Sequence, residues 1–250
     1  MRTKEAVSCE VETVEEITAN EFFSRFYAAG VPLLIRGFFR HCPAVLEWSP
    51  ARLAERFGDA VVDVMTNLRK HPNYAGERNR YARKMTMREL VEAIKRDPEG
   101  GDLYLAAQSR AFERLSLGQL ANEVNLDPLM FDGKHQRERT SLWLGPGNTV
   151  TPLHYDQMNV ILAQVWGSKR VLLIAPSETG SLYNRRGGYS DVDPESPDFE
   201  RFPLFQNVAV SVMMLEPGSA LFLPRGWWHQ VRSLTPSISL SISNFVWPNG

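Results

Sequence analysis

The sequence contains very little cysteine, little net charge and no long apolar run. Its two cysteines, Cys9 and Cys42, are too few for a disulfide framework and lack the spacing of a metal site. A formal net charge of -1 excludes a global attraction to nucleic acid or to an anionic membrane. No apolar segment is long enough to span a bilayer, and no basic start followed by an apolar run marks a signal peptide. These absences predict a soluble cytoplasmic protein without a membrane or nucleic-acid partner.

The composition is that of a globular chain, with 43% hydrophobic and 23% charged residues among 250. The length permits one large domain or two small ones. Because there are no repeats, low-complexity tracts or linkers, we expect a single domain over 1–250. Within it, 1–140 is expected to form an N-terminal α/β elaboration, and 141–250 to hold the main strands.

The N-terminal half shows mixed helix and strand patterns. Ser49 followed by Pro50 marks the start of one helix, and Thr86 with Glu89 has the spacing of a capping box at another. Helices are therefore predicted over 18–30, 49–58, 86–96 and 112–126, and strands over 31–37, 60–65 and 101–108.

The C-terminal half changes to short apolar runs that alternate with glycine and proline. Strands are predicted over 141–145, 159–167, 169–176, 208–218, 220–226 and 237–247. Regularly spaced short strands of this kind are typical of a β-sandwich or barrel. The stretch 177–207 has little periodicity and is predicted to be a long ordered loop, which in a compact domain is usually functional.

The chemistry begins with the segment "TPLHYD". On a strand, His154 and Asp156 project from the same face because they are two residues apart. His229 follows in "PRGWWHQV", next to an apolar strand. Two histidines and one carboxylate form the facial triad of non-haem Fe(II) oxygenases, which leaves three positions for co-substrates. Each histidine taken alone would also fit a hydrogen-bonded core position.

Three further residues could bind the co-substrate of such a site. A mostly apolar barrel that binds 2-oxoglutarate needs a cation for its far carboxylate, and a buried charge is tolerated only when it is paired. Lys169 in "WGSKRVLLIAP" is placed to supply that cation, and Thr151 and Tyr104 can supply hydroxyl donors. The alternatives are a solvated lysine at a strand start and ordinary strand packing.

Together these motifs resemble the JmjC (cupin-like) hydroxylases. The resemblance rests on "TPLHYD", on Lys169 fifteen residues after His154, and on "WWHQ" and "SNFVW". Within the family it is strongest to the asparaginyl hydroxylase that inhibits hypoxia-inducible factor, through "VPLLIRGFF", "GDLYL" and "DVDPESPDFERFPLFQNV". It covers the chain from about Val31 to Trp247.

The resemblance implies an all-β core with helical elaboration, folded as a double-stranded β-helix (jelly roll). It implies that Fe(II) is held by His154, Asp156 and His229, and that O2 and 2-oxoglutarate are co-substrates. It also implies that 2-oxoglutarate is bound by Lys169, Thr151 and Tyr104, and that Asn244 in "SNFVW" lies near it.

The sequence departs from the family at several positions. The family asparagine six residues after the first histidine is Val160 here, and the neighbouring Asn159 is expected to face the other way. The family glutamine two residues after the co-substrate tyrosine is Ala106. The Arg–Gln pair that binds the target asparagine falls on Gly188 and Tyr189. The C-terminal helices of the family dimer are absent, which predicts a monomer or a different dimer.

These features predict an oxygenase that hydroxylates an amino-acid side chain in a peptide or protein. Demethylation of a methylated lysine uses the same machinery and stays open. A second possibility is a hydroxylase of a small molecule or a nucleoside, and the basic run Arg78 to Lys84 supports the nucleoside alternative. A third possibility is a non-catalytic cupin. Tyr189 favours an aromatic or imidazole target over asparagine, unless Arg186 takes over the amide contact.

Overall fold

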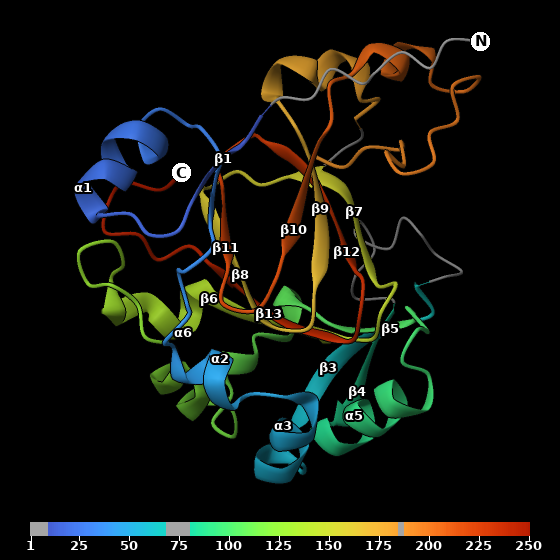
Figure 1. The fold of residues 1–250 in the computed structure, drawn as a ribbon. Coiled ribbons are helices and arrows are strands. Elements are labelled where there is room, and N and C mark those ends of the chain that lie inside the picture. Colours follow the sequence, from blue (N-terminus) through green and yellow to red (C-terminus); the bar gives the residue numbers. More distant parts are fainter. Residues whose placement is uncertain (1–9, 69–80, 185–187) are drawn as a thin grey trace.

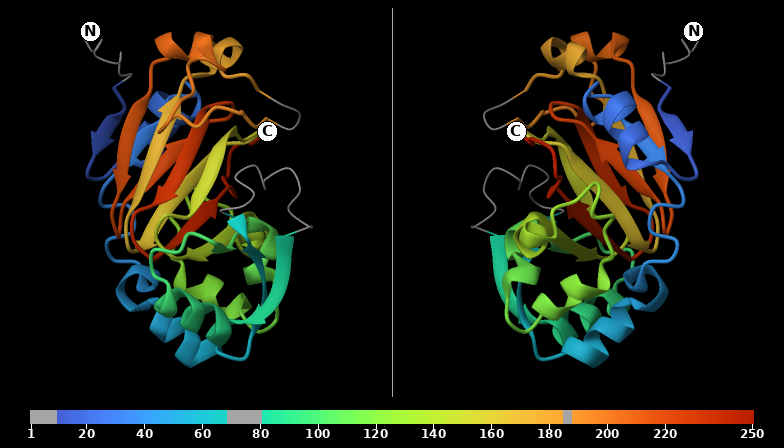
Figure 2. Two further views of the ribbon diagram at one scale, coloured as in Figure 1. Left: turned by 90° about the vertical axis from the view of Figure 1, so that its right-hand side faces the viewer. Right: turned by 90° about the vertical axis from the view of Figure 1, so that its left-hand side faces the viewer.

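The computed structural model describes residues 10–68, 81–184 and 188–250, and these form two β-sheets with peripheral helices (Figures 1 and 2). A cluster of aliphatic side chains from both sheets fills the space between them, including Leu162, Val171, Leu221 and Val231. This shared interior is the core of a sandwich. Within the described ranges, no helix is both long and apolar enough to cross a membrane.

The strands of the C-terminal half form the jelly roll that the sequence predicts. The four-stranded sheet contains, in spatial order, β10 (Ser211–Leu215), β9 (Lys169–Ile174), β12 (Trp228–Ser233) and β7 (Val150–Tyr155). The centre of the nine-stranded sheet contains β11 (Ala220–Leu223), β8 (Val160–Trp166), β13 (Ser237–Ile242) and β6 (Thr140–Gly145). The chain alternates between the sheets except from β9 to β10, where the long insert lies. The cupin-like jelly-roll fold is confirmed.

Strands from the N-terminal half extend the larger sheet at both ends. At one end are β2 (Leu33–Ile35) and β1 (Glu12–Val14), and at the other are β5 (Leu103–Leu105), β3 (Val61–Thr66) and β4 (Ala82–Thr86). Strand β4 was not predicted, because its sequence is basic rather than alternately apolar. Charged side chains suit an edge strand, since they oppose pairing with another chain. A boundary near residue 140 stays an interpretation.

Helix starts follow the capping signals closely. Helix α3 (Pro50–Phe57) begins after Ser49, whose hydroxyl accepts from Arg52 N, and α5 (Met87–Arg96) begins at a complete capping box of Thr86 and Glu89. The segment after Thr18 forms α1 (Ala19–Phe22) and continues as a π-helical turn (Phe23–Tyr27). Two short helices were not predicted, α2 (Pro43–Glu47) and α6 (Gln136–Arg139).

The predicted helix over 112–126 is wrong. The structure has 3₁₀ turns at Ala111–Glu113 and Gly118–Glu123. Arg114 between them is extended, and its guanidinium bonds to Ser109 O, to Val61 O and to the Asp63 carboxylate. These tertiary bonds, with a glycine in the segment, outweigh a weak helical propensity. Further 3₁₀ turns occupy Ala107–Ser109, Gly133–His135, Pro176–Ser181 and Pro203–Asn207.

The insert over 177–207 is ordered where the structure describes it. It builds a small apolar core of its own from Leu182, Val192, Phe202 and Phe205. These side chains pack against residues from three strands of the four-stranded sheet, which are Leu153, Ile174 and Trp228. The insert therefore covers part of the outer face of that sheet, at the top of Figure 1.

Candidate metal and co-substrate site

A cavity of about 330 Å³ opens inside the jelly roll and is lined from both sheets. His154, Asp156 and His229 lie in its wall, as do Lys169, Thr151 and Tyr104. Six of the residues that the sequence singles out therefore meet in one place, although they come from four different segments of the chain.

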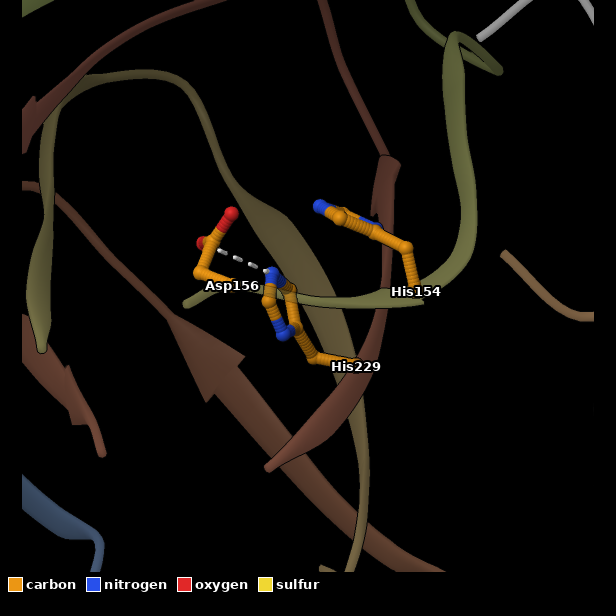
Figure 3. A group of neighbouring side chains, drawn as sticks. All are labelled: His154, Asp156 and His229. Carbon is orange, nitrogen blue, oxygen red and sulfur yellow. Dashed lines mark ion pairs between the residues drawn. The ribbon is translucent and has the colours of Figure 1, made fainter. Parts of the chain in front are cut away.

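The three potential metal ligands converge in space (Figure 3). His154 on β7 is the register partner of His229 on β12, and Asp156 follows the end of β7. One ligand atom from each residue lies within 4.8 Å of the others, and His229 Nε2 is 3.7 Å from an Asp156 carboxylate oxygen. Antiparallel pairing thus places two imidazoles side by side and a carboxylate next to them.

Backbone carbonyls fix the tautomer of both histidines. His154 Nδ1 lies 2.8 Å from Pro152 O, and His229 Nδ1 lies 3.1 Å from Trp227 O. A carbonyl oxygen only accepts, so each Nδ1 carries the hydrogen and each Nε2 keeps its lone pair for a metal. Two neutral imidazoles and one carboxylate are the donor set of a non-haem Fe(II) site with open positions. The residues present therefore fit Fe(II).

A β-bulge brings Thr151 to the same face as His154. Residues three apart on a regular strand point to opposite faces, yet both side chains line the cavity. The register shows why: His229 pairs with His154, but Val231, two residues on, pairs with Thr151, three residues back. The extra residue lies around Pro152, which has no N–H to donate to a ladder. A proline inside a strand is the sequence signal for this bulge.

Lys169 is a buried cation without a counter-charge in the described chain. It is 1% exposed, and burial lowers the pKa of its ammonium group to about 7. Its Nζ donates to Tyr104 Oη at 3.1 Å, and among the described residues no carboxylate forms an ion pair with it. A buried charge of this kind is stabilised by an anion. The carboxylate of a dicarboxylic acid such as 2-oxoglutarate fits that requirement.

The structure does not place Asn244 with these residues. Its side-chain Nδ2 donates to Asp132 O, and it lines a neighbouring cavity instead. Asn159 turns away from the metal cavity as expected, because its Oδ1 accepts from Arg225 N, while Val160 lines the cavity wall.

The predicted substrate residues lie at the edge of β7. Gly188 has a φ of 79°, and a Cβ there would lie 3.0 Å from the Tyr155 ring, so a larger side chain is strained. The ring of Tyr189 stacks on the ring of His154, with centroids 5.3 Å apart. Arg186 lies outside the described residues.

Several residues of the cavity were missed by sequence reasoning. Ser141 and Trp143 on β6, and Ser241 on β13, line the side of the cavity across from the β7 and β12 ligands. Trp143 Nε1 donates to Ser241 Oγ at 3.0 Å. Ser141 and Trp143 alternate with the buried Leu142 within a predicted strand, and this pattern could have placed both side chains on the cavity face.

A jelly roll with a His–Asp–His set inside defines the cupin type of non-haem iron protein. The chain belongs to the cupin-like domain family, whose model matches residues 19–247. JmjC-type members of this family are Fe(II)- and 2-oxoglutarate-dependent oxygenases that consume O2, and this chain holds their His–Asp–His triad.

The curated relatives include proteins with JmjC names and proteins named lysine-specific demethylases. The chain is 30% identical over 254 residues to Jumonji C domain-containing protein 5 of Drosophila melanogaster, covering 96% of this chain and 61% of the relative. It is 31% identical over 216 residues to lysine-specific demethylase 8 of Xenopus tropicalis, covering 84% and 47%. Human HSPB1-associated protein 1 is 36% identical over 134 residues, covering 51% and 27%. The chain thus spans about half the length of such relatives.

Proposed function

We propose that this chain is an Fe(II)- and 2-oxoglutarate-dependent oxygenase that hydroxylates a side chain in a peptide or protein. One observation carries the proposal: a His–Asp–His set lines the same cavity as a buried lysine that has no counter-charge among the described residues. The His–Asp–His set is suited to a metal, and the buried lysine is suited to an acidic co-substrate. A purely structural cupin needs neither.

Each residue has a defined task in this proposal. His154, Asp156 and His229 would hold Fe(II), with both imidazoles oriented by backbone carbonyls. Lys169 would pair with the far carboxylate of 2-oxoglutarate, with the Tyr104 and Thr151 hydroxyls as further donors. Bound Fe(II) and 2-oxoglutarate supply the oxidation of a substrate C–H bond by O2, with release of succinate and CO2. The apolar wall of Val160, Leu162 and Leu223 limits the access of water.

A protein substrate is supported by the relatives, which include proteins named lysine-specific demethylases. Those names also favour demethylation of a methylated lysine as a second candidate. The two outcomes are separable, because hydroxylation adds one oxygen atom to the product and demethylation removes one carbon. A nucleoside substrate has less support, since Arg83 and Lys84 of the basic run lie on the edge strand β4 and do not line the metal cavity.

The finer resemblance to an asparaginyl hydroxylase stays a prediction, and we infer that asparagine is not the preferred target. Gly188 has no side chain to bind an amide, and a Cβ at this position would lie 3.0 Å from the Tyr155 ring. One face of Tyr189 is occupied by His154, so a target side chain is left with its edge, its hydroxyl or its other face. A cytoplasmic location and a monomer or different dimer likewise stay predictions.

The test is turnover with defined peptides. The protein is incubated with Fe(II), 2-oxoglutarate, O2 and peptides that differ only in carrying His, Asn, Asp, an aromatic residue or methyl-lysine at one position. Succinate and product mass are measured together. We expect succinate and a gain of one oxygen atom on one peptide, and neither with His154→Ala. Equal product formation by His154→Ala would contradict the proposed metal site, and fastest reaction of the Asn peptide would contradict the inferred target.

A further inference from the structure

Asp156 is held in a different way from the two histidines of the metal site. His154 and His229 lie on paired strands, and each imidazole has a backbone carbonyl as its partner. Asp156 instead lies beyond the end of β7, and the next strand begins only at Val160. Its carboxylate nevertheless points toward His229 (Figure 3). The loop between the two strands must therefore position this ligand.

Two consecutive backbone N–H groups of the turn between β11 and β12 hold that loop. Gly226 N donates to Asp156 O at 3.0 Å, and Arg225 N donates to the side-chain Oδ1 of Asn159 at 2.8 Å. The same turn continues to the carbonyl that orients the imidazole of His229. Asn159 thus joins the loop of one potential metal ligand to the turn that orients another.

Asn249 holds Asn159 from a third segment, the one that follows β13. Its Oδ1 accepts from Asn159 N at 2.7 Å, and its Nδ2 donates to Asn159 O at 3.0 Å and to Ser243 O at 2.8 Å. The backbone N–H, the backbone carbonyl and the side-chain oxygen of Asn159 are all hydrogen-bonded, to segments 66 and 90 positions away in the sequence. A polar network with its bonds satisfied in this way restricts the chain to one arrangement.

We propose that Asn159, held by Asn249, is a positioning residue that keeps the Asp156 carboxylate beside His229. Neither asparagine is among the described residues that line the metal cavity, so both act through the backbone of the loop. Groups that orient a metal ligand typically contribute on the order of tenfold or more to metal affinity. This inference rests on the proposed function, because it concerns the metal site of that function.

Titration with Co(II), followed by its visible absorption, tests the inference without turnover. Asn159→Ala removes the acceptor for Arg225 N and should raise the Kd for Co(II) about tenfold and change the spectrum. Asn159→Asp keeps an oxygen acceptor at this place and should retain the wild-type spectrum. The inference is overturned if Asn159→Ala binds Co(II) as the wild type does, or if the spectrum of Asn159→Asp is as altered as that of Asn159→Ala.

Asn249→Ala keeps the test open if Asn159→Ala does not fold. It removes the two bonds to the Asn159 backbone and leaves the bond to Arg225 N in place. We expect a smaller loss of Co(II) affinity, about threefold, with a change of the spectrum in the same direction. Wild-type affinity and spectrum in Asn249→Ala would contradict the role of this residue.

A double-mutant cycle separates positioning from a general effect on the fold. If Asn159 acts through Asp156, Asn159→Ala should weaken Co(II) binding about tenfold in the wild type. It should have less than a twofold effect when Asp156 is already replaced by alanine. An equal loss of affinity in both backgrounds would mean that Asn159 does not act through this ligand, and the inference would be wrong.

Asn148→Ala is the matched control. Asn148 lies in the turn before β7, and its Nδ2 also donates to the backbone of a distant segment, at 3.3 Å from Glu99 O. Its φ of 58° makes alanine unfavourable there, so this variant should lower the melting temperature. It should leave Co(II) affinity and the spectrum unchanged. A loss of Co(II) affinity as large as that of Asn159→Ala would show that any destabilisation weakens the site, which overturns the inference.

The wild-type protein distinguishes this inference from the proposed function. If the wild type binds neither Co(II) nor Fe(II), the proposed function fails, and the inference fails with it. If the wild type binds metal and the variants of Asn159 and Asn249 bind it equally well, only the inference is wrong.

Discussion

The ring of Tyr189 stacks on the ring of His154, with centroids 5.3 Å apart and planes inclined by 16°. Backbone hydrogen bonds flank this ring contact: Tyr155 N donates to Gly188 O, and Ser190 N donates to Leu153 O. The insert thus pairs along the outer edge of β7, next to a potential metal ligand. The loop that sequence reasoning assigned to the substrate therefore also holds the imidazole of His154 in place.

Tyr189→Ala is expected to weaken metal binding, because it removes the ring that restricts His154. Groups that orient a ligand typically contribute on the order of tenfold or more to metal affinity. Titration with Co(II), followed by its visible absorption, measures both affinity and ligand geometry. Tyr189→Phe keeps the ring and should retain the wild-type spectrum. An unchanged spectrum for Tyr189→Ala, or a spectrum of Tyr189→Phe as altered as that of Tyr189→Ala, would show that stacking does not position the ligand.

His154→Ala is expected to abolish tight Fe(II) binding, since two protein ligands remain where three are needed. A metal that binds only the folded state also raises the melting temperature. Adding Fe(II) without oxygen, or Zn(II), should therefore raise the melting temperature of the wild type, and a chelator should reverse the rise. His135→Ala is the control, because His135 is an exposed histidine outside the metal cavity. The assignment is wrong if His154→Ala responds to metal as the wild type does.

Binding of 2-oxoglutarate is expected to weaken as the pH rises above about 7. Burial lowers the pKa of Lys169 to about 7, and a paired dicarboxylate raises it again by favouring the charged form. Above pH 7 the lysine must take up a proton on binding, so affinity falls by about tenfold per pH unit; below pH 7 it is already charged and affinity levels off. Calorimetry at pH 8 in two buffers of different ionisation enthalpy should show uptake of a proton.

Lys169→Met keeps the length of the side chain without its charge, and it should remove both the proton uptake and the pH dependence. It should also weaken binding by on the order of 3–5 kcal/mol, as for one partner of a buried pair. Lys95→Met is the control, because Lys95 is exposed on α5. Wild-type affinity and proton uptake in Lys169→Met would mean that another cation binds the co-substrate.

The sequence predicts the grouping of His154, Asp156 and His229 well because their geometry is local. His154 and Asp156 need only strand alternation to share a face, and His229 needs only an antiparallel neighbour. The position of Thr151 is harder to predict, because strand alternation alone places it on the face opposite to His154. It lines the cavity only because of the bulge at Pro152. The jelly roll itself follows from short strands with turn signals, whereas the basic edge strand β4 carries no apolar pattern to reveal it.

Asn244 shows the limit of transferring a role by motif. The segment "SNFVW" was predicted to continue the strand over 237–247, but β13 ends at Ile242 and Asn244 follows it. The direction of its side chain depends on a contact with Asp132, which lies 112 positions away in the sequence. Long-range hydrogen bonds of this kind are set by tertiary packing and leave no periodic signal in the sequence. The contact between Tyr189 and His154 has the same character, since it depends on how the insert folds back onto β7.

The last prediction concerns Gly188, which the sequence resemblance to an asparaginyl hydroxylase aligns with part of an amide-binding pair. A Cβ at this position meets a left-handed backbone, with φ of 79°, and the Tyr155 ring at 3.0 Å. Gly188→Ala should therefore lower the free energy of unfolding by about 1–2 kcal/mol. It should also weaken metal binding, because the insert carries Tyr189 onto His154. Denaturant unfolding and Co(II) titration measure the two effects.

Gly180→Ala is the matched control in the same insert. No atom lies within 4 Å of a Cβ at Gly180, and its φ is not in the left-handed region. This substitution should leave stability and metal affinity close to wild type. If Gly188→Ala behaves in the same way, the insert tolerates a side chain at that position. Gly188→Gln would then be a realistic route to an amide-binding loop, and the inference that asparagine is not the preferred target would lose its structural basis.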